Sequence, residues 1–255
     1  MSLPVTLDGV SRHFGGIKAV EDVSFDVAAG SITGLIGPNG AGKTTVFNLV
    51  SRVLDPTAGR VLVDGNDVTG MSMVDCAALG VARTFQTPRG FPSLTVAENV
   101  EVAYADRGEG VLGALLLRRR GEQRARAEAV LERVGLTGLR DTAYPGLSGG
   151  QRRMVEIARQ IAREPRLLLL DEPTAGLDVE HQETLRSLLL ALREQGMTIL
   201  LVEHNLRFLL RTVEVVHVMT AGQLVTSGTP DEISADERVI AAYLGRGAGH
   251  AATGT

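Results

Sequence analysis

The sequence predicts an α/β fold with a mostly parallel sheet. The apolar stretch 32–36 has the length of a strand and leads into a glycine-rich turn, which is followed by an apolar helical segment, 45–50. Two further apolar runs, 167–170 and 197–202, end abruptly in charged residues. Continuous apolar runs of this length are typical of strands that are covered on both faces, as in a parallel sheet.

The turn after the first strand has the composition of a phosphate-binding loop. Glycines let backbone amides approach a polyphosphate, and the start of the following helix adds partial positive charge. Lys43 supplies a point charge for the terminal phosphates and Thr44 a hydroxyl for Mg²⁺. A glycine-rich turn can fit this pattern by chance, but the strand before it and the helix after it favour phosphate binding. The candidate nucleotide-binding residues here are Gly37, Pro38, Asn39, Gly40, Ala41, Gly42, Lys43, Thr44 and Thr45.

Length and composition restrict the class of protein. The chain has 255 residues, 44% of them hydrophobic, which is enough to bury a core in one large domain or two small ones. Its N-terminus lacks a secretion signal and no apolar run approaches the ~20 residues that a bilayer needs, so a membrane role requires a partner. The net charge of −4 argues against a nucleic acid partner. The single Cys76 forms no internal disulfide, fits a reducing cytosol and is interpreted as a small buried residue.

The first half of the chain begins with two alternating stretches, 5–10 and 19–27, which predict antiparallel strands with one solvent-exposed face. Between them, Phe14 next to two glycines could stack on a flat base or simply cap this small sheet, and both interpretations stay open. After the loop helix, 59–68 predicts a strand, a turn and an edge strand. Residues 72–80 predict a short helix with a serine cap.

A strand is predicted over 81–86, and it ends in the isolated amide Gln86. Open α/β sheets hold their ligands at the carboxyl ends of parallel strands, which makes Gln86 a candidate site residue. A solvated loop amide is the alternative on local grounds. From Thr95, which begins a capping-box pattern, to about residue 162 the chain is predicted to be helical.

A second glycine-rich helix start follows at Ser148. This residue can cap the helix predicted over 152–163 while Gly149 and Gly150 leave their amides bare, which makes a second site for anions. An ordinary capped helix start is the alternative.

Charged and polar side chains end the two apolar runs of the second half. Asp171 and Glu172 follow the first run, and two carboxylates at a strand end are costly to bury unless a cation meets them, so a magnesium-associated Asp is expected here. His204 occupies the same strand-end position in the second run. Because three strands deliver polar side chains to one sheet edge, we expect a functional site there.

The remaining segments are a helix, a hairpin and the C-terminus. Residues 178–192 predict a helix with a leucine stripe, and 213–228 predict a hairpin. A helix is predicted over 230–244, and the last residues are small and polar, which predicts a disordered tail.

Taken in order, these residues resemble the nucleotide-binding subunit of the ATP-binding cassette (ABC) transporters over nearly the whole chain. The phosphate loop, the signature Leu-Ser-Gly-Gly-Gln at 147–151 and the acidic strand 167–172 carry this resemblance, and Gln86, the turn 175–178 and His204 match the remaining family elements. More narrowly, the segments 83–86, 172–177 and 202–205 and the extended segment to about residue 143 look like the branched-chain amino acid importer subgroup. Asn205 departs from that pattern, because aspartate is expected at its position.

The resemblance implies a P-loop NTPase (RecA-like) core with a mostly parallel sheet, an N-terminal antiparallel β subdomain and an inserted α-helical subdomain. It implies one domain over 1–245. In that arrangement 1–86 and 165–228 form the core and β subdomain, 87–164 the helical signature subdomain and 229–245 a C-terminal helix, with a disordered tail over 246–255.

The resemblance also implies a mechanism in which two subunits face head to tail and each ATP lies between the phosphate loop of one and the signature of the other. Glu172 polarises the attacking water, His204 holds the γ-phosphate and Lys43 the β and γ phosphates. Mg²⁺ is held by Thr44, Gln86 and Asp171. Phe14 stacks on adenine, and the opposite subunit's ATP is met by Ser148, Gly149, Gly150 and Gln151.

The partners implied are transmembrane permease subunits, a second ATPase subunit that is a copy or a sister chain, and indirectly a substrate-binding protein. The chain is expected at the cytoplasmic face of the membrane. Two alternatives to an amino acid importer are the cassette of an exporter or lipid mover, and a non-transport cassette ATPase acting on ribosomes or DNA. Relatives of that last class usually carry two cassettes or a long coiled-coil insertion, and this chain shows neither addition.

Overall fold

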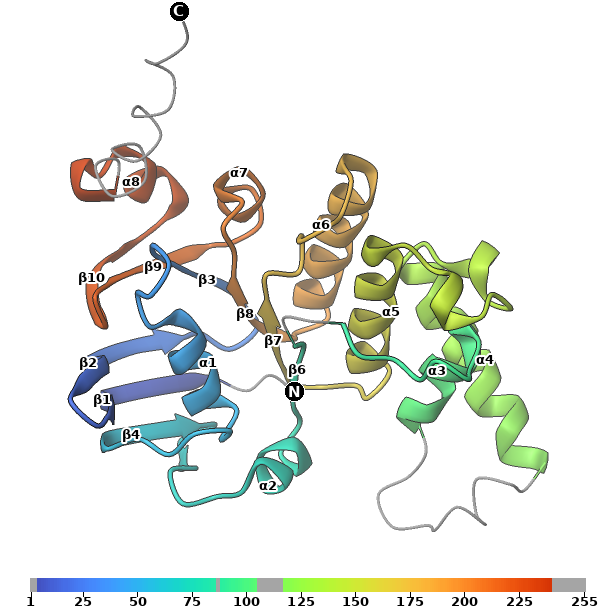
Figure 1. Ribbon diagram of the computed structural model, residues 1–255, viewed down its shortest axis with the longest axis horizontal. Helices are drawn as coiled ribbons and strands as arrows, with labels where there is room; N and C mark the ends of the chain where they lie inside the picture. Colours follow the sequence, from blue (N-terminus) through green and yellow to red (C-terminus); the bar gives the residue numbers. More distant parts are fainter. Residues whose placement is uncertain (1–3, 86–87, 105–116, 240–255) are drawn as a thin grey trace, which may run out of the picture.

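The computed structural model describes residues 4–85, 88–104 and 117–239, with the backbone alone for 117–120. Two sheets organise this part of the chain (Figure 1). The four-stranded sheet has the order β2-β1-β4-β5, and the six-stranded sheet has the order β10-β9-β3-β8-β7-β6. The α/β fold with a mostly parallel sheet is therefore confirmed.

The four-stranded sheet is antiparallel, as the alternating N-terminal pattern predicts. It comprises β1 (Val5–Phe14), β2 (Ile17–Val27), β4 (Ala58–Val63) and β5 (Asn66–Asp67). Each long strand buries alternate residues, such as Val5 and Leu7, and the residues between them are more exposed to solvent. Period-two burial of this kind is what a sheet with one covered face requires.

Five strands of the larger sheet run parallel to one another: β3 (Ile32–Ile36), β6 (Val81–Arg83), β7 (Leu167–Asp171), β8 (Thr198–Val202) and β9 (Val215–Thr220). The hairpin partner β10 (Gln223–Gly228) completes the edge as an antiparallel strand. Strand β7 lies inside the sheet, between β8 and the edge strand β6.

The helices are α1 (Lys43–Val50), α2 (Met73–Ala78), α3 (Val96–Glu101), α4 (Leu117–Arg133), α5 (Gly149–Ile161), α6 (Val179–Glu194), α7 (Leu206–Leu210) and α8 (Pro230–Ala235). Three short 3-10 helices, η1 (Val102–Tyr104), η2 (Thr137–Leu139) and η3 (Tyr144–Gly146), join the helices between β6 and β7. Figure 1 shows α3, α4 and α5 grouped at the side of the molecule away from the four-stranded sheet.

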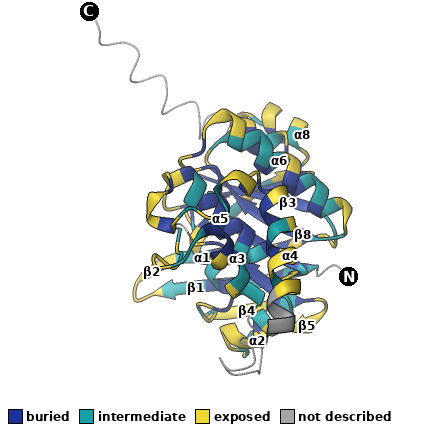
Figure 2. Ribbon diagram, turned by 90° about the vertical axis from the view of Figure 1, so that its right-hand side faces the viewer, coloured by how far each residue is buried: buried dark blue, intermediate teal, exposed yellow. Residues whose placement is uncertain are grey.

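Two hydrophobic cores lie on opposite faces of the six-stranded sheet. Alternate residues of one strand belong to different cores: Leu168 faces the core shared with α3 to α8, whereas Leu169 faces the core shared with α1 and the four-stranded sheet. Figure 2 shows this burial as a dark interior beneath exposed turns and outer helix faces. Strands covered on both faces explain why the sequence presents them as unbroken apolar runs.

Two predicted boundaries are wrong. Strand β6 ends at Arg83, and Gln86, where the predicted strand would end, lies outside the described residues. The helix predicted over 230–244 is interrupted: α8 ends at Ala235, Asp236 has extended backbone (ψ 115°), residues 237–239 are helical again, and 240–244 lie outside the described residues. The Asp236 carboxylate accepts hydrogen bonds from the Arg238 backbone amide and guanidinium, and an Asx interaction of this kind competes with continuing the helix. Residues 240–255 lie outside the described part, so the expectation of a disordered tail stays a prediction.

Candidate active site

The carboxyl ends of four neighbouring parallel strands meet at one edge of the larger sheet. In spatial order they are the ends of β3, β8, β7 and β6, which lead into the glycine-rich loop, His204, Asp171 with Glu172, and Phe85. Asp171 pairs in register with Val202, so Glu172 and Glu203 continue from adjacent strands. The sequence predicts this convergence, and the strand order confirms it for the described residues.

A hollow of about 820 Å³ lies at this edge. Its walls are the glycine-rich loop with the start of α1, the first residues of β2, the strand-end side chains Glu172 and His204, and the β9–β10 turn. The residues that line it are Ile17, Lys18, Ala19, Asn39, Gly40, Ala41, Gly42, Lys43, Thr44, Thr45, Glu172, His204 and Ala221. Phe14 is 42% exposed and is not among them; the guanidinium of Arg12 lies 4.7 Å from its ring centroid.

The loop between β3 and α1 has glycine where no side chain fits. At Gly37 a Cβ atom would meet the carbonyl oxygen of Met219 at 2.2 Å. At Gly42, which has a φ of 100°, it would meet the carbonyl oxygen of Ala19 at 2.5 Å. The loop is thus pressed between β2 and the end of β9, and this contact leaves its outer surface to the hollow.

The first turn of α1 is open to a ligand. Its N-cap Gly42 makes no side-chain cap hydrogen bond, although the first amides of a helix have no partner within the helix. Helices α2, α3, α5, α6, α7 and α8 each begin with a side chain that accepts such a bond. The backbone at the start of α1 therefore fits an anion such as a phosphate group.

Lys43 lies in the same loop and is buried. Its ammonium group donates to the carbonyl oxygens of Gly37 at 2.7 Å and of Pro38 at 3.1 Å. Burial lowers the pKa of Lys43, and the nearby carboxylates of Glu172 and Asp171 act in the opposite direction. A partly desolvated cation held at the loop is well placed to meet the negative charge of a polyphosphate.

Glu172 and His204 form a pair across the hollow. Nε2 of His204 lies 2.7 Å from Oε1 of Glu172, and the two side chains are 41% and 24% exposed respectively. Glu172 has a φ of 48°, which is unfavourable for a residue with a Cβ atom. Backbone strain of this kind clusters at functional sites. Its backbone amide is tied to the carbonyl oxygen of Val202 at 2.9 Å.

The buried carboxylate of Glu203 connects the two loops that carry this pair. One oxygen accepts from the amide of Thr174 at 2.7 Å, and the other accepts from the amides of His204 at 3.1 Å and Asn205 at 3.3 Å. Burial raises the pKa of Glu203, while these donors oppose the rise. Sequence reasoning assigned no role to Glu203, and an unbroken apolar strand ending in a carboxylate was the only available signal.

Asp171 is 2% exposed at the end of β7. Its Oδ2 lies 3.7 Å from the guanidinium of Arg83, and its Oδ1 has no hydrogen-bond partner among the described residues. Burial raises the pKa of Asp171, and Arg83 opposes that rise. An orphaned buried carboxylate oxygen fits a Mg²⁺ ion or one of its waters.

The described residues contain no group of three or more His, Cys, Asp or Glu side chains that could hold a metal alone. Mg²⁺ commonly keeps several waters and binds through one or two carboxylates plus substrate phosphates, so a single carboxylate beside a phosphate loop is a sufficient arrangement. Thr44, the predicted direct ligand, lines the hollow, whereas Gln86 lies outside the described residues.

The second glycine-rich helix start is not part of the hollow. Ser148 caps α5 through a complete capping box with Gln151, and Ser148 and Gly149 are exposed. Nothing lies within 4 Å of a Cβ atom built at Gly149, whereas one at Gly150 would meet the carbonyl oxygen of Gly176 at 2.9 Å. In Figure 1, α1 and α5 lie on opposite sides of strands β8 and β7. The fold therefore does not bring 148–151 to the phosphate loop of the same chain.

A strand, a glycine loop and an uncapped helix, with a buried Asp and a Glu–His pair at the neighbouring strand ends, define a P-loop NTPase. Similarity to known protein families narrows this class. The family model described as ABC transporter matches residues 20–175, and the model described as branched-chain amino acid ATP-binding cassette transporter matches residues 223–249. The chain belongs to the ABC transporter family and is one of its ATP-binding subunits, which hydrolyse ATP to power transport.

Two relatives illustrate the range of the family. The high-affinity branched-chain amino acid transport ATP-binding protein BraF of Pseudomonas aeruginosa is 38% identical over 253 residues, which cover 96% of this chain and 99% of that protein. The lipopolysaccharide export system ATP-binding protein LptB of Haemophilus influenzae is 35% identical over 241 residues, which cover 94% of this chain and 97% of that protein.

Two solved structures share the fold. One is the ADP conformation of MJ1267, an ATP-binding cassette of an ABC transporter, with a TM-score of 0.83, 31% identity and coverage of 96% of this chain and 100% of that one. The other is the dimeric structure of MJ0796, a bacterial ABC transporter cassette, with a TM-score of 0.78, 27% identity and coverage of 89% and 98%.

Proposed function

We propose that this subunit energises an importer of branched-chain amino acids or related amides. The observation that carries the proposal is a site with every described part of an ATPase, followed by a C-terminal segment, 223–249, that matches the branched-chain amino acid cassette model. Relatives named for this transport align over nearly their whole length, such as the 38% identical LivG of Escherichia coli K12. The narrower expectation from the sequence agrees with these matches.

Within this proposal two ATPase subunits, two copies or this chain with a sister chain, clamp ATP between them. The separation of the phosphate loop from the exposed helix start at Ser148 supports this, because one nucleotide cannot bridge both sites in one chain. The dimeric cassette structure among the structural neighbours also supports it. Loss of the γ-phosphate then removes a contact between the two subunits and lets them separate.

The residues of the hollow and of the segments around it divide the work of hydrolysis. The amides at the start of α1 and the ammonium of Lys43 hold the phosphates, and Glu172 accepts a hydrogen bond from the attacking water and orients it. His204 positions Glu172 and meets the γ-phosphate. Mg²⁺ would neutralise charge on the phosphate oxygens, with Thr44, Asp171 and Gln86 as the residues that hold it. Phe14 keeps its proposed role as a stacking surface for adenine, on an exposed ring near the first residues of β2.

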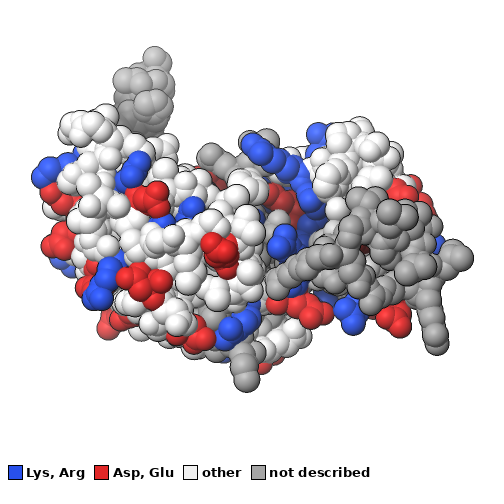
Figure 3. All heavy atoms as spheres, turned by 90° about the horizontal axis from the view of Figure 1, so that it is seen from below, with Lys and Arg blue, Asp and Glu red and all other residues white. Residues whose placement is uncertain are grey.

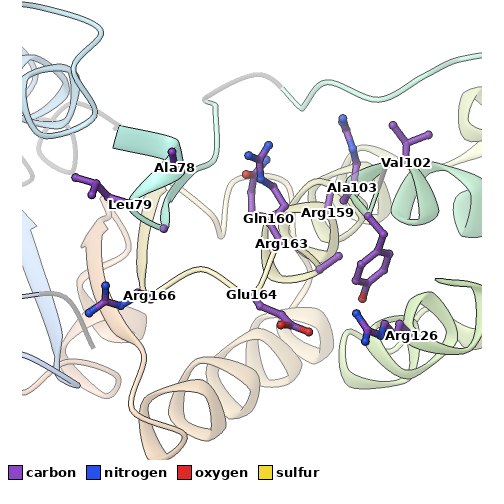
Figure 4. Close-up of a pocket in the computed structure, with 13 residues that line it drawn as sticks. Ala78, Leu79, Val102, Ala103, Arg126, Arg159, Gln160, Arg163, Glu164 and Arg166 are labelled. Carbon is purple, nitrogen blue, oxygen red and sulfur yellow. The ribbon is translucent and has the colours of Figure 1, made fainter. Parts of the chain in front are cut away.

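A membrane partner has a candidate docking place on another face. Within the described residues no helix is both long and apolar enough to cross a bilayer. A hollow of about 700 Å³ lies where α2 and the residues before β6 approach η1, α4 and the end of α5. Arg126, Arg159, Arg163 and Arg166 line it, with Glu164 as the acidic residue (Figure 4). Figure 3 shows Lys and Arg gathered along a recess between the two halves of the molecule.

This basic hollow favours an acidic segment, which we assign to a permease subunit at the cytoplasmic face of the membrane. Arg126→Glu combined with Arg163→Glu should reduce co-purification with the permease while leaving ATP hydrolysis by the isolated subunit unchanged. Arg124→Glu is the matched control because Arg124 lies on the same helix, α4, but does not line the hollow. Equal retention of the permease by the double variant and the control would contradict this docking place.

The transport direction and cargo are tested in the complex reconstituted with its permease subunits and binding protein. Hydrolysis that rises several-fold with a loaded branched-chain amino acid binding protein supports the importer. An exporter is the second candidate, favoured by the 35% identity to LptB. ATPase stimulation by lipid, without any response to the loaded binding protein, would favour the exporter.

A further inference from the structure

Arg83 is a partly buried arginine at the end of β6, and the proposed mechanism of hydrolysis assigns it no role. Its side chain is 11% exposed, and burial lowers its pKa. Keeping a guanidinium out of water is costly unless hydrogen bonds and an opposite charge compensate it. The contacts of Arg83 show where that compensation comes from.

Two of these contacts reach α1, the helix that begins at the phosphate loop. The Nη1 group donates to Oδ1 of Asn48 at 2.5 Å and to Oγ of Ser51 at 2.9 Å. The guanidinium also lies 5.9 Å from the ring centroid of Phe47, on the same helix. Arg83 therefore fixes the second turn of α1 relative to strand β6.

The other end of the guanidinium faces Asp171. Its Nη2 lies 3.7 Å from Oδ2 of Asp171, while Oδ1 of the same carboxylate has no partner among the described residues. The amide of Asp171 donates to Oγ1 of Thr84, the residue after Arg83, at 3.2 Å. One oxygen of Asp171 is thus directed toward Arg83, and the other is left for a cation.

We propose that Arg83 is a positioning residue for the Mg²⁺ site: it holds Asp171 and α1 in one arrangement, so that Oδ1 of Asp171 and the hydroxyl of Thr44 face the same ion. The proposal rests on the Mg²⁺ role given to Asp171 and Thr44 above. Groups that orient a metal ligand without touching the metal typically change metal affinity about 10- to 100-fold when they are removed.

The planar guanidinium suits this position better than an ammonium. It can donate to Asn48 and Ser51 with one nitrogen and direct a second nitrogen toward Asp171, whereas lysine offers a single point of charge. Arg83→Lys should therefore keep the charge and lose the connection between α1 and β7. Arg83→Met removes both while keeping a long apolar stem.

The test measures binding of Mn²⁺, as a paramagnetic substitute for Mg²⁺, to the full chain with a nonhydrolysable ATP analogue, using the electron paramagnetic resonance signal of free Mn²⁺. For Arg83→Met we expect Mn²⁺ affinity to fall about 10-fold or more. The affinity for the analogue in EDTA should stay within about twofold of wild type, because Arg83 contacts the second turn of α1 and not the phosphate loop. The Mn²⁺ affinity of Arg83→Lys should lie between those of the wild type and Arg83→Met. Arg60→Met is the matched control, since Arg60 pairs with Asp8 on the exposed face of the four-stranded sheet.

A double-mutant cycle separates positioning from a general structural role. If Arg83 acts through Asp171, the loss of Mn²⁺ affinity caused by Arg83→Met should be clearly smaller in an Asp171→Asn background than in the wild type. Additive losses, or wild-type Mn²⁺ affinity in Arg83→Met, would overturn the proposal. If Asp171→Asn binds Mn²⁺ as tightly as the wild type does, the metal role of Asp171, on which the proposal rests, is refuted.

If Arg83→Met fails to fold, Asn48→Ala tests the positioning role of Arg83 instead. This variant removes one anchor of Arg83 on α1 and retains the arginine. A reduction of Mn²⁺ affinity by a few-fold, with analogue affinity in EDTA unchanged, supports positioning. Unchanged Mn²⁺ affinity contradicts it.

Discussion

Nε2 of His204 lies 2.7 Å from Oε1 of Glu172, although the two residues follow different strands and are 32 positions apart in the sequence. The pair exists because β7 and β8 are neighbours in register and because Glu203 ties the loops after them together. A histidine in contact with a carboxylate can hold that carboxylate in one rotamer and one orientation, which is what a group that positions water requires.

Glu172→Gln should separate nucleotide binding from turnover. An amide keeps the shape of the side chain but is a poor acceptor for the proton of the attacking water, so hydrolysis should fall roughly 10²- to 10⁴-fold. ATP should still bind and accumulate a nucleotide-bridged dimer, detected by size-exclusion chromatography with ATP. Monomer alone, alongside normal turnover, would rule out this role for Glu172.

Glu203→Gln tests the connection between the two catalytic loops. The carboxylate accepts three backbone N–H bonds, and a glutamine NH₂ group would face at least one of these donors. An unsatisfied buried group costs about 1–3 kcal/mol, so we expect a lower midpoint of urea unfolding and turnover reduced about 10-fold or more. ATP affinity should change little because Glu203 does not line the hollow. Unchanged turnover with a lowered midpoint would make Glu203 purely structural.

Ser148→Arg should leave nucleotide binding by the isolated chain largely intact and abolish turnover. Ser148 is exposed and lies outside the hollow, so a bulky cation there obstructs only a nucleotide presented by a second subunit. Ser72→Arg is a matched control, because Ser72 forms the same capping box at the start of α2. Each variant loses a helix cap at about 1 kcal/mol, but only Ser148→Arg should stop hydrolysis. Loss of equilibrium ATP binding would place Ser148 in the pocket of its own chain.

Gly37→Ala should disrupt the phosphate loop. The added Cβ atom would lie 2.2 Å from the carbonyl oxygen of Met219, which is backbone and cannot rotate away. The loop must shift, and we expect loss of ATP binding of at least about 10-fold, measured with a fluorescent ATP analogue. Gly70→Ala is the control, since a Cβ atom at Gly70 has open space around it. Wild-type affinity in Gly37→Ala would show that the loop tolerates displacement.

His217 predicts a pH dependence of stability that is independent of the active site. The ring is buried against Phe25, with Nδ1 2.7 Å from Oγ of Ser227 and Nε2 3.1 Å from the carbonyl oxygen of Asp26. Since a carbonyl only accepts, Nε2 donates and neutral Nδ1 accepts from the serine. Burial lowers the pKa of His217 below its ordinary 6.5. The native state therefore keeps a neutral ring at a pH where the unfolded chain has begun to bind a proton.

The direction of the pH dependence follows from this difference in bound protons. Above about pH 6.5 both states are neutral and His217 contributes no slope, and below it the free energy of unfolding falls by up to about 1.4 kcal/mol per pH unit. His217→Gln keeps a donor and an acceptor but cannot titrate, so its unfolding free energy should fall less steeply between about pH 6.5 and 5.5. Urea unfolding across this range checks the slopes. Parallel curves for variant and wild type would show that His217 is not responsible.

Local sequence rules account for the parts of the site built within one element. The apolar run, the glycines and the apolar helical segment over 32–50 indicate the strand, loop and helix that the structure shows, because strand, turn and helix each have a recognisable local pattern. Thr95 forms the capping box that its sequence predicts, and Ser72 and Ser148, which were predicted as helix caps, form capping boxes as well. The unbroken apolar runs correctly predicted strands covered on both faces, and those strands end where charge first appears.

Tertiary structure alone decided which distant side chains meet. Strand order places β7 between β8 and β6, and only that order brings Glu172 to His204 and Arg83 to Asp171 and Asn48. The same is true of Gly37 and Gly42, whose need for glycine comes from carbonyl oxygens of Met219 and Ala19 far along the chain. Periodicity fixes which face of an element is buried but not which neighbour covers it, since many pairings bury equal apolar area. The sequence therefore determined the pieces of the site, and packing of the two sheets determined their contacts.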